Sequence, residues 1–370
     1  MTDKCMMVFD SCKSTKGYNR GIIIDFHRFK YFYVPNTLID FLNENDRLNL
    51  VQIKKNHFKN REIIDEYLTF LESNEIISFI DNTIKNNFPK MSEEFYFPGS
   101  ISNIILDFNL LEYDFSNFLI EAVNLGARFL QIRFFNVVTF EFLKNILTKL
   151  NDLGFYSIEL VINYNDLFNN KNLELLKNFN LIQNIFCYNS PKDGLEEIYS
   201  KIIVYSTQSN INLSQCGYVS KNSFSFTTDH FFESKTYNTC LNKKISINEL
   251  GQIKKCPSSN EILGDVKKND LKEIISLKEF SRYDLINKDK IEVCNACEHR
   301  YICTDCRINL SNSNNIYSKP KHCSYNPYIS KWEGEEGYKT LAECGVISNE
   351  NGFSIDHDKI AEINKELWGE

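Results

Sequence analysis

Several features that mark common functions are missing from this 370-residue sequence. No apolar run reaches the roughly eighteen residues of a membrane-spanning helix, and the first residues lack the apolar stretch and cleavage site of a secretory signal. No basic cluster resembles those that grip phosphate backbones, since 42 Lys and Arg stand against 49 Asp and Glu, for a net charge of −7. We therefore expect a cytoplasmic protein that binds neither membranes nor nucleic acid.

Glycine motifs for nucleotide phosphates are missing as well, because the sequence contains neither G-x-G-x-x-G nor a P-loop. Strand-like runs nevertheless alternate with helical patterns from residue 101 to residue 206, and Gly126 and Gly154 stand where two of the helices should end. The expected strands are 101–108, 128–135, 157–164, 181–188 and 201–206. This alternation predicts an α/β fold with a mostly parallel sheet. A partial βα barrel fits the missing glycine motifs better than the rival, a Rossmann-like sheet.

The N-terminal region has a different pattern. The runs GIIID and KYFYV within residues 20–34 predict a hairpin, with its bend at His27 and Arg28. A helix should open at Asn60 or Arg61, and EIISFI at 75–80 should form a strand after it. This order of elements predicts a small winged-helix-like unit within residues 1–88.

Cysteine is absent from residues 13 to 186, yet it is dense afterwards. Three of the 12 cysteines are scattered and are expected to be ordinary buried thiols: Cys5, Cys12 and Cys187. The other nine indicate a separate cysteine-bearing module after about residue 210: Cys216, Cys240, Cys256, Cys294, Cys297, Cys303, Cys306, Cys323 and Cys344. Disulfides are improbable in a reducing compartment.

The spacing of the late cysteines indicates metal binding. They run Cys240-x10-Gly251-x4-Cys256, and then C-x2-C-x5-C-x2-C from Cys294 to Cys306, followed by Cys323. A C-x2-C turn places two thiolates on one metal centre, and a [4Fe-4S] cluster takes four such ligands. Structural zinc could use the same thiolates and stays an alternative. His299 and His322 flank cysteines, and we expect each to be solvated or to support a ligand.

The order of seven cysteines and one glycine from residue 240 to residue 323 resembles the SPASM domain, an auxiliary iron-sulfur module of radical SAM peptide-modifying enzymes. The one departure is x2 where that family usually has x3, before Cys306. The resemblance implies two [4Fe-4S] clusters. One would be held by Cys294, Cys297, Cys303 and Cys323 (cluster A). The other would be held by Cys240, Cys256 and Cys306, with Cys216 as the best candidate for a fourth ligand and Cys344 as the runner-up (cluster B).

A radical SAM enzyme also needs a C-x3-C-x2-C loop after its first barrel strand. The corresponding stretch, DFNLLEYDFSNF at residues 107–118, contains no cysteine, so no S-adenosylmethionine site is expected. Substitute ligands such as Asp107, Glu112 and Asp114 would be unsuited to iron-sulfur, and these carboxylates should cap helices or face water. The expected fold is thus a degenerate partial (βα) barrel of radical SAM type, joined to the winged-helix-like unit and the SPASM module.

Nearly the whole chain is similar to the SPASM-domain peptide maturases of grasp-with-spasm systems. The motifs that carry this likeness are KGYNRGIIIDFHRFKYFYVP, CLNKKISINELGQIKKCPS and KDKIEVCNACEHRYICTDCR. The family implies an ATP-grasp ligase and a ribosomally made precursor peptide as partners, with the peptide bound by strand addition to an N-terminal sheet edge.

Four regions are expected: a peptide-recognition domain at 1–88, the partial barrel at 97–210, the SPASM domain at 211–330 and a C-terminal capping segment at 331–370. No residue stands out as a general acid or base, so catalytic residues stay unknown. The alternative function is a non-catalytic zinc-binding scaffold that brings ligase and peptide together.

Overall fold

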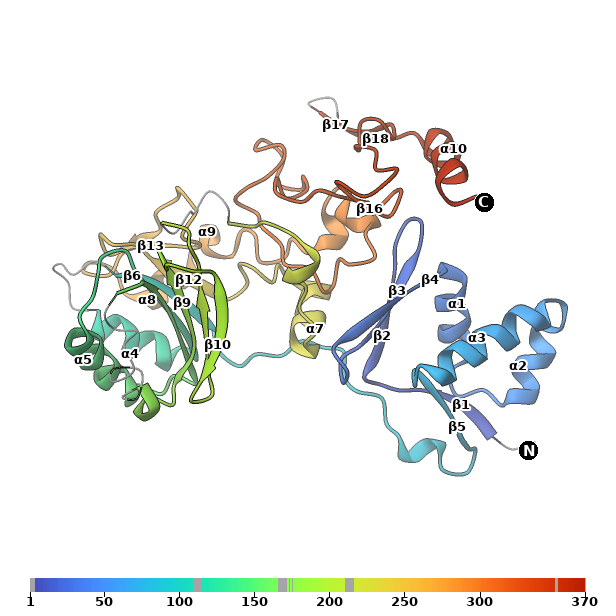
Figure 1. Ribbon diagram of the computed structural model, residues 1–370, viewed down its shortest axis with the longest axis horizontal. Coiled ribbons are helices and arrows are strands. Elements are labelled where there is room, and N and C mark those ends of the chain that lie inside the picture. Colours follow the sequence, from blue (N-terminus) through green and yellow to red (C-terminus); the bar gives the residue numbers. More distant parts are fainter. Residues whose placement is uncertain are drawn as a thin grey trace. The chain divides into compact units, whose positions relative to one another are not determined.

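A computed structural model shows how these regions fold (Figure 1). It describes residues 4–108, 115–165, 172, 174, 176–209, 216–349 and 352–369. The chain divides into two compact units. Unit 1 consists of Met1–Phe95, Gly217–Thr239 and Ile286–Glu370, and unit 2 consists of Tyr96–Cys216 and Cys240–Leu285. The cysteine-rich stretch therefore contributes to both units, and the four predicted functional regions stay a prediction.

Unit 2 contains a nine-stranded, mostly parallel sheet with the order β10-β11-β9-β8-β7-β6-β12-β13-β14. Its strands are β6 (Asn103–Phe108), β7 (Phe129–Phe134), β8 (Ser157–Asn163), β9 (Ile182–Tyr188), β10 (Gly194–Ile198), β11 (Lys201–Tyr205), β12 (Lys244–Ile247), β13 (Gln252–Lys254) and β14 (Gly264–Asp265). Pairing is parallel from β11 through to β12 and antiparallel at both ends. The predicted α/β class with a mostly parallel sheet is confirmed, and β10 is a strand that the pattern did not predict.

Helices cover one face of this sheet. They are α4 (Ser116–Asn124), α5 (Phe140–Asn151), η4 (Leu176–Asn178), α8 (Leu271–Ser276) and α9 (Lys278–Ser281). Alternate strand residues such as Ile104 and Leu106 point into the same core as Leu119 and Leu147 of the helices, as the two-residue period of a strand requires. Gly126 follows α4 with φ +105°, a conformation that ends a helix and that favours glycine.

The N-terminal part of unit 1 holds two small antiparallel sheets and a helical layer. Strands β2 (Cys12–Lys16), β3 (Gly21–Asp25) and β4 (Lys30–Val34) form one sheet, and β1 (Lys4–Val8) pairs with β5 (Ile77–Asp81) in the other. The helices are α1 (Asn36–Asn45), α2 (Leu50–Asn56), η1 (Phe58–Asn60), α3 (Arg61–Ser73) and η2 (Lys85–Asn87). The predicted hairpin, helix and closing strand are confirmed as β3–β4, α3 and β5.

The rest of unit 1 carries short elements around the late cysteines. They are η6 (Lys221–Ser223), α7 (Thr228–Thr236), η7 (Lys288–Lys290), η8 (Cys294–Ala296), β15 (Tyr325–Asn326), β16 (Lys331–Trp332), β17 (Val346–Asn349), β18 (Gly352–Ile355) and α10 (His357–Trp368). With so little regular structure, this region depends on side-chain packing and on whatever its cysteines bind.

Strand β3 separates two hydrophobic cores within unit 1. Ile23 packs with α1 and α3 in the N-terminal core. Ile22 and Ile24 point the other way, into a core with Cys303 and Trp332 of the cysteine-bearing region. The N-terminal sheet is therefore a structural wall of the cysteine module.

Candidate metal centre

Four cysteines of unit 1 line a single small cavity: Cys294, Cys297, Cys303 and Cys323. Aromatic and apolar side chains, among them Phe224 and Trp332, form much of the rest of its wall. The structure thus brings together the four thiols that the sequence assigns to cluster A.

Tight backbone turns place three of these thiols at the cavity. Cys294 and Cys297 lie at the ends of a C-x2-C turn closed by a 3.0 Å bond from the Cys297 amide to the Cys294 carbonyl. Val293, just before it, has φ +68°, which is a strained conformation for a β-branched residue. The Cys303 amide donates to the carbonyl of His299 at 3.0 Å, so the next cysteine returns toward the same place.

Burial makes this cavity unfavourable for free thiolates. It raises the pKa of Cys294 to about 12 and that of Cys303 to about 11, and it raises the pKa of Cys297 well above its usual value. Neighbouring cysteines add to each shift by electrostatic repulsion. A bound metal reverses this balance, because its positive charge stabilises the deprotonated sulfurs. The donor set therefore fits a metal centre with sulfur ligands.

A buried cation stands beside the four sulfurs. Lys288 is only 4% exposed, and its ammonium donates to the Cys303 carbonyl at 2.5 Å. Burial opposes its charge, yet the pKa of Lys288 is raised because Cys303, Asp305 and Cys294 supply nearby negative charge. A buried lysine needs such compensation. Lys288 thus matches a cluster whose ligands carry net negative charge.

A buried ion pair between Arg307 and Asp305 connects the loops around the cavity. The Arg307 guanidinium is fully buried and donates to Asp305 at 2.8 Å and to the Ser318 carbonyl at 2.8 Å. Asp305 also accepts a bond from Asn238. These contacts tie the segment after Cys303 to the segment that leads to Cys323.

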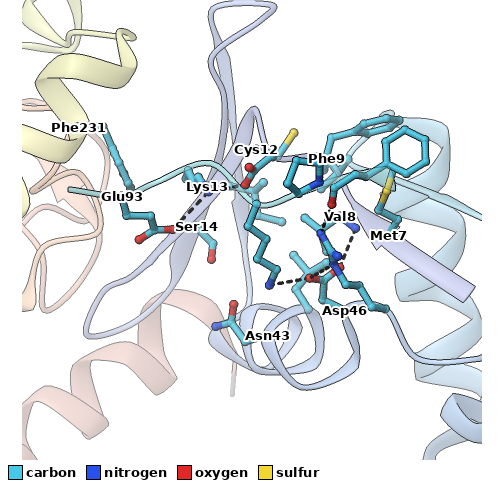
Figure 2. Close-up of a pocket in the computed structure, with 18 of the residues that line it drawn as sticks. Met7, Val8, Phe9, Cys12, Lys13, Ser14, Asn43, Asp46, Glu93 and Phe231 are labelled. Atoms are coloured by element: carbon cyan, nitrogen blue, oxygen red, sulfur yellow. Dashed lines mark hydrogen bonds and ion pairs between the residues drawn. The ribbon is translucent and has the colours of Figure 1, made fainter. Parts of the chain in front are cut away.

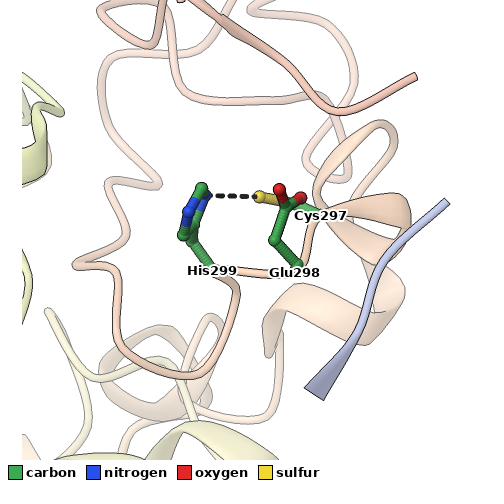
Figure 3. A group of neighbouring side chains, drawn as sticks. All are labelled: Cys297, Glu298 and His299. Carbon is green, nitrogen blue, oxygen red and sulfur yellow. Dashed lines mark hydrogen bonds between the residues drawn. The ribbon is translucent and has the colours of Figure 1, made fainter. Parts of the chain in front are cut away.

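His299 is buried rather than solvated, so of the two roles expected for it only the supporting one fits. Its Nδ1 lies 3.8 Å from Cys297 Sγ (Figure 3), and the Tyr33 hydroxyl lies 2.9 Å from its Nε2. Burial, together with the charges of Arg20 and Lys221, lowers the pKa of His299 to about 3, so the ring is neutral. A neutral imidazole carries one N–H, so in the tautomer whose Nε2 accepts from Tyr33, Nδ1 donates toward the Cys297 sulfur.

Glu298 completes this group. Its side chain is fully buried, and Oε1 accepts bonds from Arg20 at 2.9 Å and from Tyr325 at 2.5 Å. A ligand atom of Glu298, one of His299 and Cys297 Sγ lie within 4.8 Å of one another (Figure 3). Such a mixed Cys, Glu and His set could also hold zinc.

Three cysteines of the other predicted cluster come together in unit 2. The thiols of Cys216 and Cys256 hydrogen-bond each other, and Cys240 is close enough to affect the Cys256 thiol electrostatically. That hydrogen bond, burial and Cys240 all raise the pKa of Cys256. This grouping favours Cys216 as the fourth ligand that the spacing left open.

The remaining predicted ligand, Cys306, belongs to unit 1, where it is 2% exposed. A Cβ on Gly217 would lie 2.8 Å from Cys306 Sγ, so the glycine permits a close approach of the two segments. The runner-up Cys344 also lies in unit 1. It is fully buried, accepts a bond from the Asn326 amide at 3.3 Å and packs among apolar side chains. The full ligand set of cluster B stays a prediction.

Strand β6 of unit 2 carries a buried salt bridge at Asp107. Arg133 forms a two-pronged pair with the Asp107 carboxylate, at 2.6 and 2.8 Å, and both side chains are buried. The expectation that Asp107 caps a helix or faces water is therefore wrong. Glu112 and Asp114 lie outside the described residues.

Other expectations are settled more simply. Cys5, Cys12 and Cys187 are buried thiols, as predicted. His322 is partly exposed, and its carbonyl accepts a bond from the Val219 amide. Among the described residues, no helix combines the length and the apolarity needed to cross a bilayer.

Comparison with known proteins gives little. No family model matches the chain, and no curated protein matches it either. Three crystal structures of Streptococcus suis SuiB align with 85% of this chain and 99% of theirs. One is bound to S-adenosylmethionine (13% identity, TM-score 0.35), one to the precursor peptide SuiA (13%, 0.36), and the third is described as SuiB alone (14%, 0.35). A likeness this weak carries no argument about fold or function.

Proposed function

We propose that this chain is a peptide-binding, iron-sulfur component of a system that matures a ribosomally made peptide, working with an ATP-grasp ligase. The observation that carries the iron-sulfur part is the cavity lined by Cys294, Cys297, Cys303 and Cys323, with the buried Lys288 beside it. A [4Fe-4S] cluster bound there would supply one-electron chemistry or a rigid structural core. Cluster B would be held by Cys216, Cys240, Cys256 and Cys306.

A degenerate partial barrel of radical SAM type is part of this proposal. The parallel strands follow one another across the sheet in the order of the sequence, as in a βα barrel: β6, β7, β8, β9 and β11. A doubly wound sheet would reverse direction among these strands. The sequence contains no cysteine from residue 13 to residue 186, so this proposal includes no S-adenosylmethionine site.

The peptide-binding part rests on the exposed edges of the N-terminal sheet, because an edge strand presents unpaired backbone groups to an extended peptide. Deleting residues 1–88 would be a poor test, since Ile22 and Ile24 belong to the core around the cysteines. The intact chain, titrated with the precursor peptide encoded beside its gene, is the sound test. We expect saturable binding, and its absence would remove peptide recognition from the proposal.

The iron-sulfur claim is tested by composition. After anaerobic purification we expect a brown protein with about eight irons and eight sulfides per chain, four for each cluster. The double variant Cys294→Ser/Cys303→Ser should lose about four of each. The control Cys344→Ala should retain them all. A colourless wild-type protein would contradict the proposal.

A second candidate is a zinc-stabilised scaffold that brings ligase and peptide together. The placing of Glu298 and His299 next to Cys297 favours it, because zinc accepts nitrogen, oxygen and sulfur ligands together. Stoichiometric zinc without sulfide in the purified protein would select this candidate.

A further inference from the structure

Unit 1 contains a second and much larger cavity, of about 640 Å³, on the other side of strand β3. We call it the strap cavity, because residues 85–93, which begin with η2 and which we call the strap, form part of its wall. Its size falls within the range of about 300–1,000 Å³ that is usual for ligand sites. None of its lining residues is a proposed metal ligand.

Both apolar and charged side chains line the strap cavity, among them Met7, Lys13, Asp46 and Glu93 (Figure 2). Met7, Ile23, Leu42 and Ile76 are almost completely buried and form part of the floor. The charged rim consists of Asp10, Lys13, Asp46, Arg47, Lys90, Glu93 and Lys235. This combination suits a ligand with an apolar group and a polar backbone, rather than a lipid or a polyanion.

Ser14 of β2 lies in the cavity wall, and its backbone N–H and C=O are not used in pairing with β3. The amide of Phe26 donates to Ser11 and the amide of Gly17 donates to Arg20, so odd-numbered residues of β2 face β3. Ser14 therefore turns its N–H and C=O away from β3 at the free edge of the sheet, where it lines the cavity. A backbone donor and acceptor on one residue is the pair that an added antiparallel strand uses.

The acids of the rim are already engaged. Asp10 pairs with Lys13 at 2.7 Å, Glu93 pairs with Lys235 at 2.5 Å, and Asp46 pairs with Lys90 at 2.8 Å. These pairs also hold the strap, which supplies Lys90 and Glu93. A cationic ligand group would have to displace them.

Arg47 is a cation of the cavity lining that also contacts the strap. Its two terminal nitrogens donate to the strap carbonyls of Lys85 and Phe88, but its buried Nε has no hydrogen-bond partner within the described part of the chain. The nearest carboxylate oxygen of Asp46 lies 3.9 Å from that Nε. Arg47 also has φ +66°, an unfavourable conformation that the fold maintains. A ligand carboxylate that reaches the guanidinium would complete its hydrogen bonding.

We propose that the strap cavity binds an extended peptide that pairs with the Ser14 backbone, places one apolar side chain on the floor and offers a carboxylate to Arg47. This inference rests on the proposed function, because it locates the peptide site on the edge of β2. It further specifies the peptide as one with an apolar residue and an acidic residue close together.

The test uses a synthetic set of fluorescein-labelled octapeptides and the full-length chain. All have a Thr-Ala background with Leu at position four, and position six is Asp, Asn or Lys. Because the Arg47 contact is charge-assisted, we expect the Asn peptide to bind about tenfold more weakly than the Asp peptide, and the Lys peptide more weakly still. Replacing Leu with Ser should cost about tenfold or more, since the floor is apolar.

Matched variants locate the peptide. Ser14→Pro removes the N–H that points away from β3 and should lower the affinity for the Asp peptide by about tenfold or more. Ser14→Ala keeps the backbone N–H and should bind the Asp peptide with unchanged affinity. Arg47→Asn, which tolerates positive φ, should abolish the preference for Asp over Asn, and Arg61→Asn on the exposed start of α3 is its control. Amide exchange at Ser14 should slow when peptide is added. If Ser14→Pro does not fold, the Arg47→Asn variant and amide exchange at Ser14 still test whether the peptide binds in the strap cavity.

Equal binding of the Asp and Lys peptides, or unchanged exchange at Ser14 on binding, would overturn this site. If the precursor peptide then still binds to the wild type and to Arg47→Asn with equal affinity, peptide recognition stands and takes place elsewhere. If no precursor peptide binds to the wild type, the proposed function itself fails.

Discussion

The two cavities of unit 1 differ in what surrounds them, although a single strand separates them. The cysteine cavity is small, has four thiols in its wall and also has the buried Lys288 in its lining. The strap cavity is large, and exposed ion pairs hold its outer wall. A buried site whose donors repel one another needs a permanent occupant, whereas a wall held by surface ion pairs can exchange its ligand.

The largest effect should come from removing the occupant of the cysteine cavity. Without it, buried thiols replace a metal centre in a region with little regular structure. Cys294→Ser/Cys303→Ser, or iron removal by a chelator, should lower the melting temperature of unit 1 by about 10 °C or more. Differential scanning calorimetry measures this melting temperature. The control Cys344→Ala should melt like the wild type before chelation, and chelation should lower its melting temperature by the same amount. An unchanged melting temperature would show that the cavity has no structural occupant.

The next effect concerns the buried cation. Lys288→Met removes the positive charge next to Cys303 and leaves Asp305 with less compensation. We expect a loss of about 3–5 kcal/mol in unfolding free energy and a more negative reduction potential for the cluster. Urea denaturation and potentiometric titration measure the two. The exposed Lys290→Met serves as the control, and an unchanged potential would refute the pairing of Lys288 with a cluster.

Strand β3 allows the two cavities to be compared directly. Ile23→Ala and Ile24→Ala remove the same atoms from opposite faces, and each should cost about 2–5 kcal/mol. Only Ile24→Ala should also lower iron content, and only Ile23→Ala should alter octapeptide binding. If both variants change both properties, β3 does not separate the two sites.

The bend after β3 should show a pH dependence. Burial opposes ionisation of Asp25, but hydrogen bonds from the Arg28 side chain at 2.8 Å and from the backbone amides of Arg28 and His27 lower the pKa of this carboxyl. The unfolded state therefore takes up the proton first, so the stabilisation is present above about pH 4 and is lost as the pH falls through the lower, folded-state pKa.

Asp25→Asn should accordingly cost about 1–3 kcal/mol at pH 7 and less at pH 3. Urea unfolding at the two pH values checks this, with the surface variant Asp40→Asn as the control. An equal loss at both pH values would contradict the role of the charge.

The smallest effect should come from the hydroxyl that orients His299. Tyr33→Phe removes the bond to Nε2 and should cost about 0.5–1.5 kcal/mol, with iron content unchanged. Its neighbour Tyr31→Phe is the control, and chemical denaturation is the measurement. A loss of iron in Tyr33→Phe would mean that His299 is itself a metal ligand.

Particular elements show how far sequence reasoning reached. The strands β6, β7, β8 and β9 were predictable because their apolar residues follow a local two-residue period, and α3 was predictable from its helical spacing. Strand β1 was not predicted, because its partner is the distant strand β5, with Val8 opposite Ile77 and Lys4 opposite Asp81. Between β8 and β9 the described residues show only the short η4, and much of that connection lies outside the described part.

At the cysteine cavity, too, local features were predictable from the sequence and contacts between distant segments were not. Spacing alone singled out Cys294, Cys297, Cys303 and Cys323, since a C-x2-C turn is a local device and its geometry follows from the chain itself. No local pattern marks Lys288 as a buried cation, and none predicts that Tyr33 meets His299, because both facts arise from packing between distant segments.

The sequence by itself determined the local order of strands and helices, the grouping of thiols by spacing and the absence of the radical SAM cysteine triad. Only the tertiary structure decided that β3 separates a cysteine cavity from a charged one, that Cys216 lies beside Cys256 and that Asp107 pairs with Arg133. The physical reason is that burial and charge compensation depend on neighbours in space, which a linear pattern does not contain.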